Sequence, residues 1–281
     1  MSAGRRTVLV TGASTGIGHA TAKHLGASGF DVRAGVRKPA DAERLEREPG
    51  VTPVTIDVTD TDSIAAAAAT LPDELYGLVN NAGVAVNAPV EYVPLDELRR
   101  QLEVNLVGQV AVTQAVLGRV RAAQGRVLFV TSVGGRIALP LFAPYAASKF
   151  GLEAVADAMR RETRDQGIEV IVIQPGGTAT PIWDRGAATA DAMRAEMPPE
   201  AGQRYGRMME ILQEEAVKAA KGKAGAVPPE YVAKKIGRAL TAEKPKIRYP
   251  SRDARVAIGL QRLLGDRAFD WIVARPVLSY G

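Results

Sequence analysis

The chain contains no cysteine and only two histidines among its 281 residues. The absence of cysteine excludes disulfides and thiolate catalysis, and it is typical of proteins in a reducing compartment. His19 and His24 lie on one predicted helix at a spacing that does not place them on the same face. This scarcity disfavours a histidine-based metal site and a Ser-His-Asp triad, and there is no Gly-x-Ser-x-Gly elbow. We therefore expect no metal ion and no hydrolase chemistry.

Long apolar runs are missing as well. No stretch approaches the roughly 18 apolar residues that cross a membrane, and the run Val8-Leu9-Val10 is too short for the core of a signal peptide. The sequence therefore predicts a soluble, untargeted protein, and the lack of cysteine favours the cytoplasm.

Charge of one sign is not concentrated in any part of the chain. The formal net charge is +5, and basic residues are mixed with acidic ones instead of forming a basic stripe. An ordinary solvated surface explains this pattern better than nucleic-acid binding does, so we expect no nucleic-acid partner.

With 46% hydrophobic residues, the chain has enough apolar side chains for a sizeable core. We expect one large domain over residues 1–281.

Short β-rich runs alternate with helical patterns along most of the chain. Several runs are continuously apolar, as strands buried on both faces of a parallel sheet are. The alternation predicts an α/β protein with a doubly wound parallel sheet, the Rossmann fold. Asp96 is expected to cap the long helix that follows Pro94. The predicted strands are Thr7 to Thr11, Asp31 to Val36, Val51 to Asp57, Gly77 to Asn80, Arg126 to Ser132, Glu169 to Gln174 and Lys246 to Tyr249, and the predicted helices are 16–28, 39–47, 60–70, 96–121 and 144–165.

After Pro175-Gly176 the alternation stops, and residues 176–245 are mainly helical and loop-like. We expect this segment to close over the substrate. Its clustered methionine and aromatic residues are typical of an adaptable apolar pocket, and equally of helices that pack on a domain. The residues concerned are Ile182, Trp183, Met193, Met197, Tyr205, Met208, Met209, Ile211 and Leu212.

Residues 250–281 form a C-terminal extension. Between Arg252 and Arg275 it mixes five arginines with large apolar residues. Docking on the domain is the favoured interpretation, and attachment to a membrane surface is the alternative. The apolar residues are Leu260, Leu263, Leu264, Phe269, Trp271 and Ile272.

A glycine-rich turn follows the first predicted strand and precedes a helix. It reads Thr11-Gly12-Ala13-Ser14-Thr15-Gly16-Ile17-Gly18. Glycines let the backbone approach a pyrophosphate closely, and a helix N-terminus offers free N–H groups and a positive dipole. The spacing is G-x-x-x-G-x-G and not G-x-G-x-x-G, so the motif alone leaves open that the glycines merely turn the chain.

Tyr145 and Lys149 lie four positions apart on a predicted helix that begins near Pro144, so both side chains project from one face. A nearby ammonium favours the phenolate, so we expect Lys149 to lower the pKa of Tyr145 and the pair to serve as a general acid/base. On its own this spacing is more typical of a solvated helix face. Ser132, however, ends an apolar strand, where open α/β sheets place their ligand crevice.

Together these motifs resemble the short-chain dehydrogenase/reductase family, from about Thr7 to Pro181. Their order and separations match the family, including thirteen positions from Ser132 to Tyr145 (145 − 132). The residues from Pro175 to Trp183 and the extended C-terminus resemble its hydroxysteroid and retinol dehydrogenase branch. The matching elements are the turn from Thr11 to Gly18, Asp57-Val58, Asn80-Asn81-Ala82-Gly83, Asn105, Ser132, Tyr145-Ala146-Ala147-Ser148-Lys149, Pro175-Gly176 and Thr180.

The resemblance implies an enzyme that interconverts an alcohol and a ketone or aldehyde, with the hydride carried by a nicotinamide cofactor. It implies that Tyr145 donates or accepts the proton, that Lys149 binds the nicotinamide ribose and tunes Tyr145, and that Ser132 orients the carbonyl. It also implies that Asn105 holds a water in a proton relay, whereas a solvent-facing amide is the alternative. The implied cofactor-binding residues are Gly12, Ser14, Thr15, Gly16, Ile17, Gly18, Asp57, Val58, Asn81, Ala82, Gly83, Tyr145, Lys149, Pro175, Gly176 and Thr180.

Two of these elements have simpler explanations. Asn81-Ala82-Gly83 resembles the family's sheet-stabilising turn beside the adenosine, but asparagine and glycine also favour an ordinary turn at the end of a strand. Asp57 resembles the carboxylate that accepts from the adenine amino group. It would otherwise be a helix N-cap, a role that Asp60 could fill equally well.

The choice of cofactor depends on the end of the second strand, where a carboxylate usually binds the ribose 2′-hydroxyl of NAD. Val36 stands there, followed by Arg37 and Lys38. An arginine pairs with a 2′-phosphate through a planar fork of donors. We therefore expect NADP(H) to be favoured over NAD(H), with Arg37 as the contact. The alternative is that Arg37 and Lys38 are solvated residues of a loop.

The rival to an enzyme is a dinucleotide-sensing Rossmann protein without catalysis. A sensor would keep the glycine-rich turn but has no need of Ser132, Tyr145 and Lys149 together. An extended-type epimerase or dehydratase would show another glycine spacing and a longer substrate domain. We expect a small apolar alcohol or carbonyl compound as the substrate, and a homodimer or homotetramer as the assembly.

Overall fold

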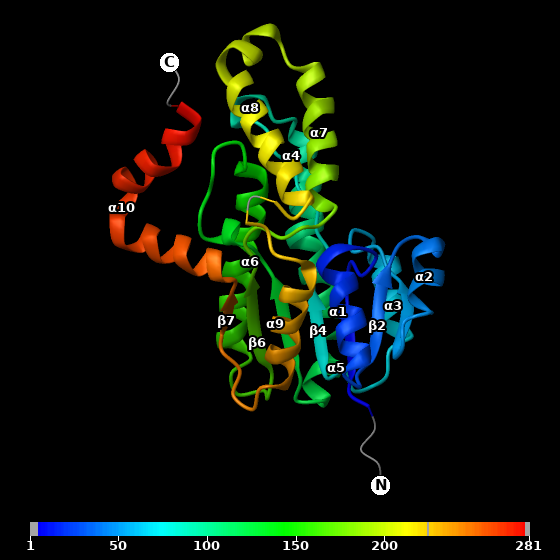
Figure 1. Cartoon of the computed structure of the whole chain (residues 1–281). Helices are drawn as coiled ribbons and strands as arrows, with labels where there is room; N and C mark the ends of the chain where they lie inside the picture. Colours follow the sequence, from blue (N-terminus) through cyan, green and yellow to red (C-terminus); the bar gives the residue numbers. More distant parts are fainter. Residues whose placement is uncertain (1–4, 224, 279–281) are drawn as a thin grey trace.

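A parallel β-sheet forms the centre of the computed structural model, which describes residues 5–223 and 225–278 (Figure 1). In this described part the sheet has seven strands in the order β3-β2-β1-β4-β5-β6-β7. The strands are β1 (Thr7–Val10), β2 (Asp31–Val36), β3 (Val51–Thr55), β4 (Gly77–Asn80), β5 (Arg126–Val130), β6 (Glu169–Gln174) and β7 (Arg248–Pro250), and all neighbouring pairs are parallel.

The strand order reverses direction at the centre of the sheet. The chain first builds outward from β1 to β3, then returns to place β4 on the other side of β1 and builds outward to β7. This is the doubly wound order, so the predicted Rossmann fold is confirmed. In such sheets a crevice opens at the carboxyl ends of the two strands where the order reverses, here β1 and β4.

Helices cover both faces of the sheet. On one face α1 (Gly16–Ala27), α2 (Pro39–Leu45) and α9 (Pro229–Thr241) pack on apolar strand residues, and on the other face α3 (Thr61–Ala69), α5 (Gly108–Ala122) and α6 (Ala143–Glu162) do so. The central strands alternate between the two cores. Leu78 belongs to one core and Val79 to the other, and both are completely buried.

Most of the predicted element boundaries lie close to the observed ones, and β2, β4 and β6 agree residue for residue. Strands β1 and β5 end before the predicted Thr11 and Ser132. The hydrogen-bond ladder still continues for one bond past each end, because Thr11 N donates to Val79 O (3.0 Å) and Thr131 N donates to Ile173 O (2.9 Å). The backbone then leaves the sheet, so the next residues face the crevice.

The long helix predicted over residues 96–121 is interrupted. It consists of α4 (Leu95–Leu102), a π-helical turn η2 (Glu103–Val107) and α5. Gly108 follows the π-helical turn, and a Cβ there would overlap the carbonyl oxygen of Val58. The backbones of Gly108 and Val58 thus lie close together at the place where the π-helical turn interrupts the helix. The predicted cap was wrong: Pro94 occupies the N-cap, and Asp96 lies in the first turn, where it pairs with Arg99 (2.7 Å).

The first part of the segment 176–245 forms two helices above the carboxyl edge of the sheet. The helices α7 (Ile182–Glu196) and α8 (Pro199–Ala220) pack on each other as an antiparallel pair that stands above the sheet in Figure 1. The chain then returns to the sheet through α9 and β7. A bridge between Thr178 and Val227 joins the beginning and the end of this excursion.

The C-terminal extension forms the helix α10 (Arg252–Leu278), which is kinked at Gly265 (φ 66°) and reaches away from the sheet in Figure 1. The first turns of α10 pack on the domain with one side, where Ala254 and Ile258 are buried against Ile137. Residues 279–281 lie outside the described part. In the part that is described, no helix is both long enough and apolar enough to cross a membrane. Several large apolar residues remain exposed on α10, namely Val256, Leu260, Leu263, Leu264, Trp271 and Ile272.

Candidate active site

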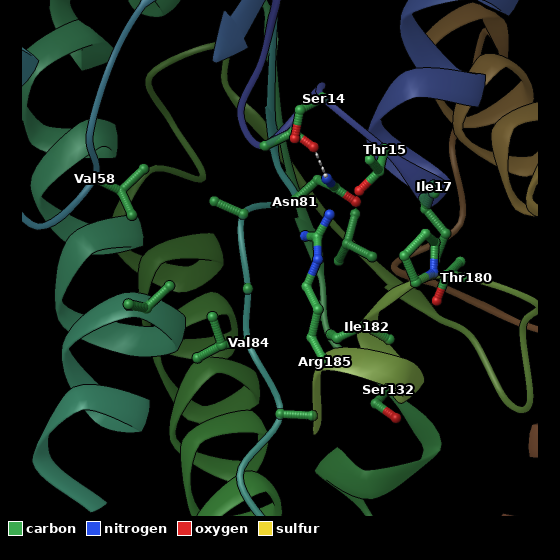
Figure 2. Close-up of a pocket in the computed structure, with 18 of the residues that line it drawn as sticks. Ser14, Thr15, Ile17, Val58, Asn81, Val84, Ser132, Thr180, Ile182 and Arg185 are labelled. Atoms are coloured by element: carbon green, nitrogen blue, oxygen red, sulfur yellow. Dashed lines mark hydrogen bonds between the residues drawn. The ribbon is translucent and has the colours of Figure 1, made fainter. Parts of the chain in front are cut away.

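A cavity of about 510 Å³ opens at the carboxyl edge of the sheet, at the crevice between β1 and β4 (Figure 2). It brings together nearly all of the residues that the sequence predicted to be catalytic or cofactor-binding. The two exceptions are Gly18 and Asn105, which lie behind its wall. The predicted residues that line it are Gly12, Ser14, Thr15, Gly16, Ile17, Arg37, Asp57, Val58, Asn81, Ala82, Gly83, Ser132, Tyr145, Lys149, Pro175, Gly176 and Thr180.

The glycine-rich turn is packed against the turn that follows β4. Gly12 has φ +64°, and a Cβ on it would lie 2.8 Å from the Cα of Ala82. Asn81 Nδ2 donates to the carbonyl oxygens of Thr11 (3.0 Å) and Gly12 (3.2 Å), and Thr11 Oγ1 accepts from the backbone N–H groups of Asn81 and Ala82. Asn81 therefore holds the glycine-rich turn in place, which is more than an ordinary turn at a strand end would do.

Helix α1 presents an uncapped N-terminus to the cavity. Thr15 occupies the N-cap, but its side chain makes no capping hydrogen bond. Free N–H groups and the helix dipole favour the binding of an anion at the N-terminus of α1. Gly12, Gly16 and Gly18 carry no side chain that would shield these N–H groups, so the turn and the helix N-terminus fit the diphosphate of a dinucleotide. Across the described residues, no group of three or more His, Cys, Asp or Glu side chains could hold a metal ion.

Asp57 and Arg37 face each other at the far end of the cavity. Arg37 Nη1 lies 3.6 Å from Asp57 Oδ2, and Asp57 Oδ1 accepts from the backbone N–H and the hydroxyl of Thr59. Burial raises the pKa of Asp57, but the hydrogen bonds from Thr59 and the charge of Arg37 outweigh it, so that the pKa lies below its ordinary value. Asp60 caps α3 by accepting from Asp62 N and Ser63 N. The alternative that Asp57 is the N-cap of this helix was therefore wrong.

Ser132, Tyr145 and Lys149 meet at the opposite end of the cavity. Ser132 follows β5, whereas Tyr145 and Lys149 lie one turn apart near the start of α6. All three are at least nine-tenths buried. Ser132 Oγ accepts from Gly134 N (3.0 Å), and Lys149 Nζ donates to Val130 O (2.9 Å).

Burial shifts the two titratable groups of this cluster in ways that the sequence did not predict. It raises the pKa of Tyr145, while a hydrogen bond from Ser132 opposes the shift. Burial also lowers the pKa of Lys149 to about 8. The predicted lowering of the Tyr145 pKa by Lys149 was therefore wrong for this structure, because desolvation of the phenol dominates. At neutral pH Tyr145 holds its proton, which suits a proton donor.

Asn105 lies in the π-helical turn η2 and is completely buried. Its Oδ1 accepts from Val84 N (2.8 Å), and its Nδ2 donates to Val84 O (3.0 Å) and to Ser148 Oγ (3.1 Å). The solvent-facing alternative was wrong, because the amide ties the chain after β4 to α6. The role in a proton relay stays a prediction.

The loop after β6 forms another wall of the cavity, beside the glycine-rich turn. Gly176 N donates to Ser251 Oγ (2.8 Å), and Gly177 N donates to Asp253 Oδ2 (3.0 Å), so the start of α10 holds this loop. Thr180 comes close to the glycine-rich turn, since a Cβ on Gly16 would lie 3.0 Å from its Cγ2.

Aromatic side chains border the catalytic end of the cavity. The ring of Phe142 lies 6.4 Å from those of both Tyr145 and Trp183, edge to face. Ile182 and Trp183 line the cavity, which is the first of the two alternatives that the sequence left open for this segment. Most of the other apolar residues of the segment do not. Met193 packs on Val86 and Ala88, and a second cavity of about 30 Å³ is lined by Met197, Met209 and Leu212.

The sequence reasoning missed several residues of the cavity. Arg100 and Arg185 bring positive charge to it, and the apolar side chains of Val84, Val104 and Ile56 complete its walls. Arg185 lies two positions after the singled-out Trp183, so its position was a usable indication. The others belong to loops and helices whose direction only the fold reveals.

Comparisons with known proteins agree with this geometry. The family model described as short chain dehydrogenase matches residues 6–191. An NADPH-dependent 3-dehydrocapnine reductase of Ornithobacterium rhinotracheale is 36% identical over 256 residues, which cover 87% of each chain. Retinol dehydrogenase 5 of Mus musculus is 33% identical, covering 97% of this chain and 90% of the relative. The crystal structure of a short-chain dehydrogenase from Streptomyces avermitilis superimposes with a TM-score of 0.77 at 28% identity, covering 93% of each chain.

Proposed function

The chain belongs to the short-chain dehydrogenase/reductase family, in its hydroxysteroid and retinol dehydrogenase-like branch, and on this premise we propose that it interconverts apolar alcohols with their ketones or aldehydes, using NADP(H). The observation that carries the proposal is the buried cluster of Ser132, Tyr145 and Lys149 at one end of a dinucleotide-sized cavity. A dinucleotide sensor would need the cavity but not this cluster.

The reaction would need one proton and one hydride for each carbonyl group. A bound nicotinamide supplies or accepts the hydride. The hydroxyl of Ser132 is placed to donate to the carbonyl oxygen of the substrate. Tyr145, whose raised pKa keeps it protonated near neutrality, gives its proton to that oxygen as the alcohol forms. The charged ammonium of Lys149, 5.8 Å from the centroid of the Tyr145 ring, stabilises the phenolate that remains.

An apolar substrate is favoured by the walls beside this cluster. The cavity is lined by the aromatic and aliphatic side chains of Trp183, Ile182 and Val84. Phe142 packs edge to face on both Tyr145 and Trp183. Burial of apolar substrate area there would contribute about 25 cal/mol per Å². Residues 176–245 supply part of these walls and would determine specificity.

NADP(H) is favoured by the end of β2. Val36 is buried and carries no carboxylate for a 2′-hydroxyl, while the side chain of Arg37 is 66% exposed and lines the cavity. A relative of this chain is named as NADPH-dependent. A single domain, assembly as a homodimer or homotetramer, and a cytoplasmic location complete the proposal.

The test is a screen of the purified protein for turnover of alcohols, ketones and aldehydes with each cofactor. We expect hydrophobic ketones or alcohols to give the highest kcat/KM, and NADPH to exceed NADH. Higher kcat/KM on small sugars or hydroxy acids would refute the apolar substrate class. A protein that binds the cofactor but turns over none of the compounds would support the sensor instead.

A further inference from the structure

Arg185 extends into the main cavity from the start of α7. It lies one turn after Ile182 and lines the cavity. In Figure 2 its side chain points toward Asn81 and the glycine-rich turn and away from Ser132. It therefore reaches across from the helical segment above the sheet toward the uncapped N-terminus of α1.

Arg185 differs from the other arginines around this cavity in having no carboxylate partner within the described part of the chain. Arg37 pairs with Asp57 (3.6 Å), Arg44 pairs with Asp41 (3.0 Å), and Arg100 pairs with Glu97 (2.6 Å). Arg44 also donates to the backbone carbonyl of Ser14. Arg185 thus brings a guanidinium with unused donors into the cavity.

The groups that it faces are themselves suited to an anion. The N-terminus of α1 offers N–H groups without a side-chain cap and a positive dipole, and the glycines of the turn carry no side chain that would shield them. The guanidinium of Arg185 is positively charged and faces the positive end of the α1 dipole. This arrangement is electrostatically unfavourable unless a negatively charged ligand lies between the two groups. A guanidinium fork matches phosphate oxygens in pairs.

We propose that Arg185 binds the diphosphate of the nicotinamide dinucleotide. Arg185 would contact the diphosphate from the substrate segment, and the glycine-rich turn would contact it from the sheet. The inference rests on the use of a nicotinamide dinucleotide, but not on the choice between NADP(H) and NAD(H). It assigns a cofactor contact to the helix that begins with two substrate-facing residues, Ile182 and Trp183.

The test compares Arg185→Gln with the parent by isothermal titration calorimetry, using NADP⁺ and, as a fragment without the diphosphate, adenosine 2′-monophosphate. We expect the Kd of the variant for NADP⁺ to be about tenfold or more higher than that of the parent, because one charge-assisted phosphate contact is lost. The Kd for the fragment should stay within about twofold of the parent value. If the parent prefers NAD⁺, then NAD⁺ and adenosine are the matched probes.

Arg194→Gln is the control. Arg194 lies on the same helix, pairs with Glu210 (3.4 Å) and does not line the main cavity, so its loss changes the net charge equally and should leave both affinities unchanged.

An unchanged affinity of Arg185→Gln for the dinucleotide would overturn the proposal. So would an equal loss for the fragment, which would indicate a general disturbance of the site. A normal affinity for the cofactor together with a raised KM for the substrate would assign Arg185 to the substrate instead. Failure of the proposed function has a different signature, because the parent would then bind the dinucleotide without turning over any carbonyl compound.

Discussion

Lys149 Nζ lies 5.8 Å from the centroid of the Tyr145 ring, and both side chains are buried near the start of α6. Burial acts on their protons in opposite directions, since it raises the pKa of the phenol and lowers that of the ammonium to about 8. Near neutral pH the pair therefore consists of a neutral tyrosine and a charged lysine. This is the state that the proposed role of Tyr145 as proton donor requires.

The first prediction concerns the pH dependence of carbonyl reduction. Lys149 is charged below about pH 8 and loses its proton as the pH rises through that value. Because a neutral amine no longer stabilises the phenolate of Tyr145, kcat/KM for reduction should be constant below about pH 8 and fall above it. Steady-state rates with a non-ionising ketone between pH 6.5 and 9.5 test this, with circular dichroism to show that the fold persists. A profile that stays flat to pH 9.5 would contradict the role of Lys149.

The second prediction concerns Tyr145→Phe. Only the hydroxyl is lost, so the ring still packs on Phe142, and cofactor affinity should change by no more than about threefold. Turnover should fall by about 10² to 10⁴-fold, as expected for the loss of a general acid. Comparison of kcat with the calorimetric affinity for the cofactor separates the two effects. A variant with full activity would exclude Tyr145 as the proton donor.

The third prediction concerns the choice of cofactor. In Arg37→Ala, kcat/KM with NADPH should fall about tenfold or more while that with NADH stays nearly constant, because only NADPH carries the 2′-phosphate. Arg47→Ala is the matched control, since Arg47 is exposed and does not line the cavity. Arg37 does not bind the 2′-phosphate if the parent prefers NADH, or if the variant keeps its preference for NADPH.

The fourth prediction compares two glycines. A Cβ on Gly18 would overlap the carbonyl oxygen of Gly12 and crowd Asn81 Nδ2, so Gly18→Ala should lower the stability by about 1 to 3 kcal/mol and weaken cofactor binding. Gly118 lies on the exposed side of α5 with nothing within 4 Å of its Cβ position. Gly118→Ala should therefore stabilise the protein by about 0.5 to 1 kcal/mol. Thermal unfolding and calorimetry measure both effects. Equal behaviour of the two variants would show that the contact of Gly18 with the turn is unimportant.

Local sequence features predicted much of the site because its chemistry is local. The glycine-rich turn lies between a strand and a helix, and Tyr145 and Lys149 share a helix face by their spacing alone. Short β-rich runs predicted the strands β2, β4 and β6 to the residue. The absence of cysteine and the scarcity of histidine excluded other chemistries without any knowledge of the fold.

What failed or was missed depends on contacts between distant parts of the chain. No periodicity shows the π-helical turn that carries Asn105, because it coincides with the approach of the Gly108 backbone to Val58. The raised pKa of Tyr145 could not be predicted either, since desolvation depends on how the loops close over α6.

The sequence by itself determined the fold class, the glycine-rich turn and the identities of the proposed catalytic side chains, because these predictions follow from residue type and short-range spacing. Only the tertiary structure decided which arginine faces the glycine-rich turn and which methionines pack between helices. It places Arg185 opposite the N-terminus of α1, more than 150 positions earlier in the chain (185 − 16 = 169). Such a juxtaposition results from the packing of α7 above the sheet, and packing is a property of the whole chain.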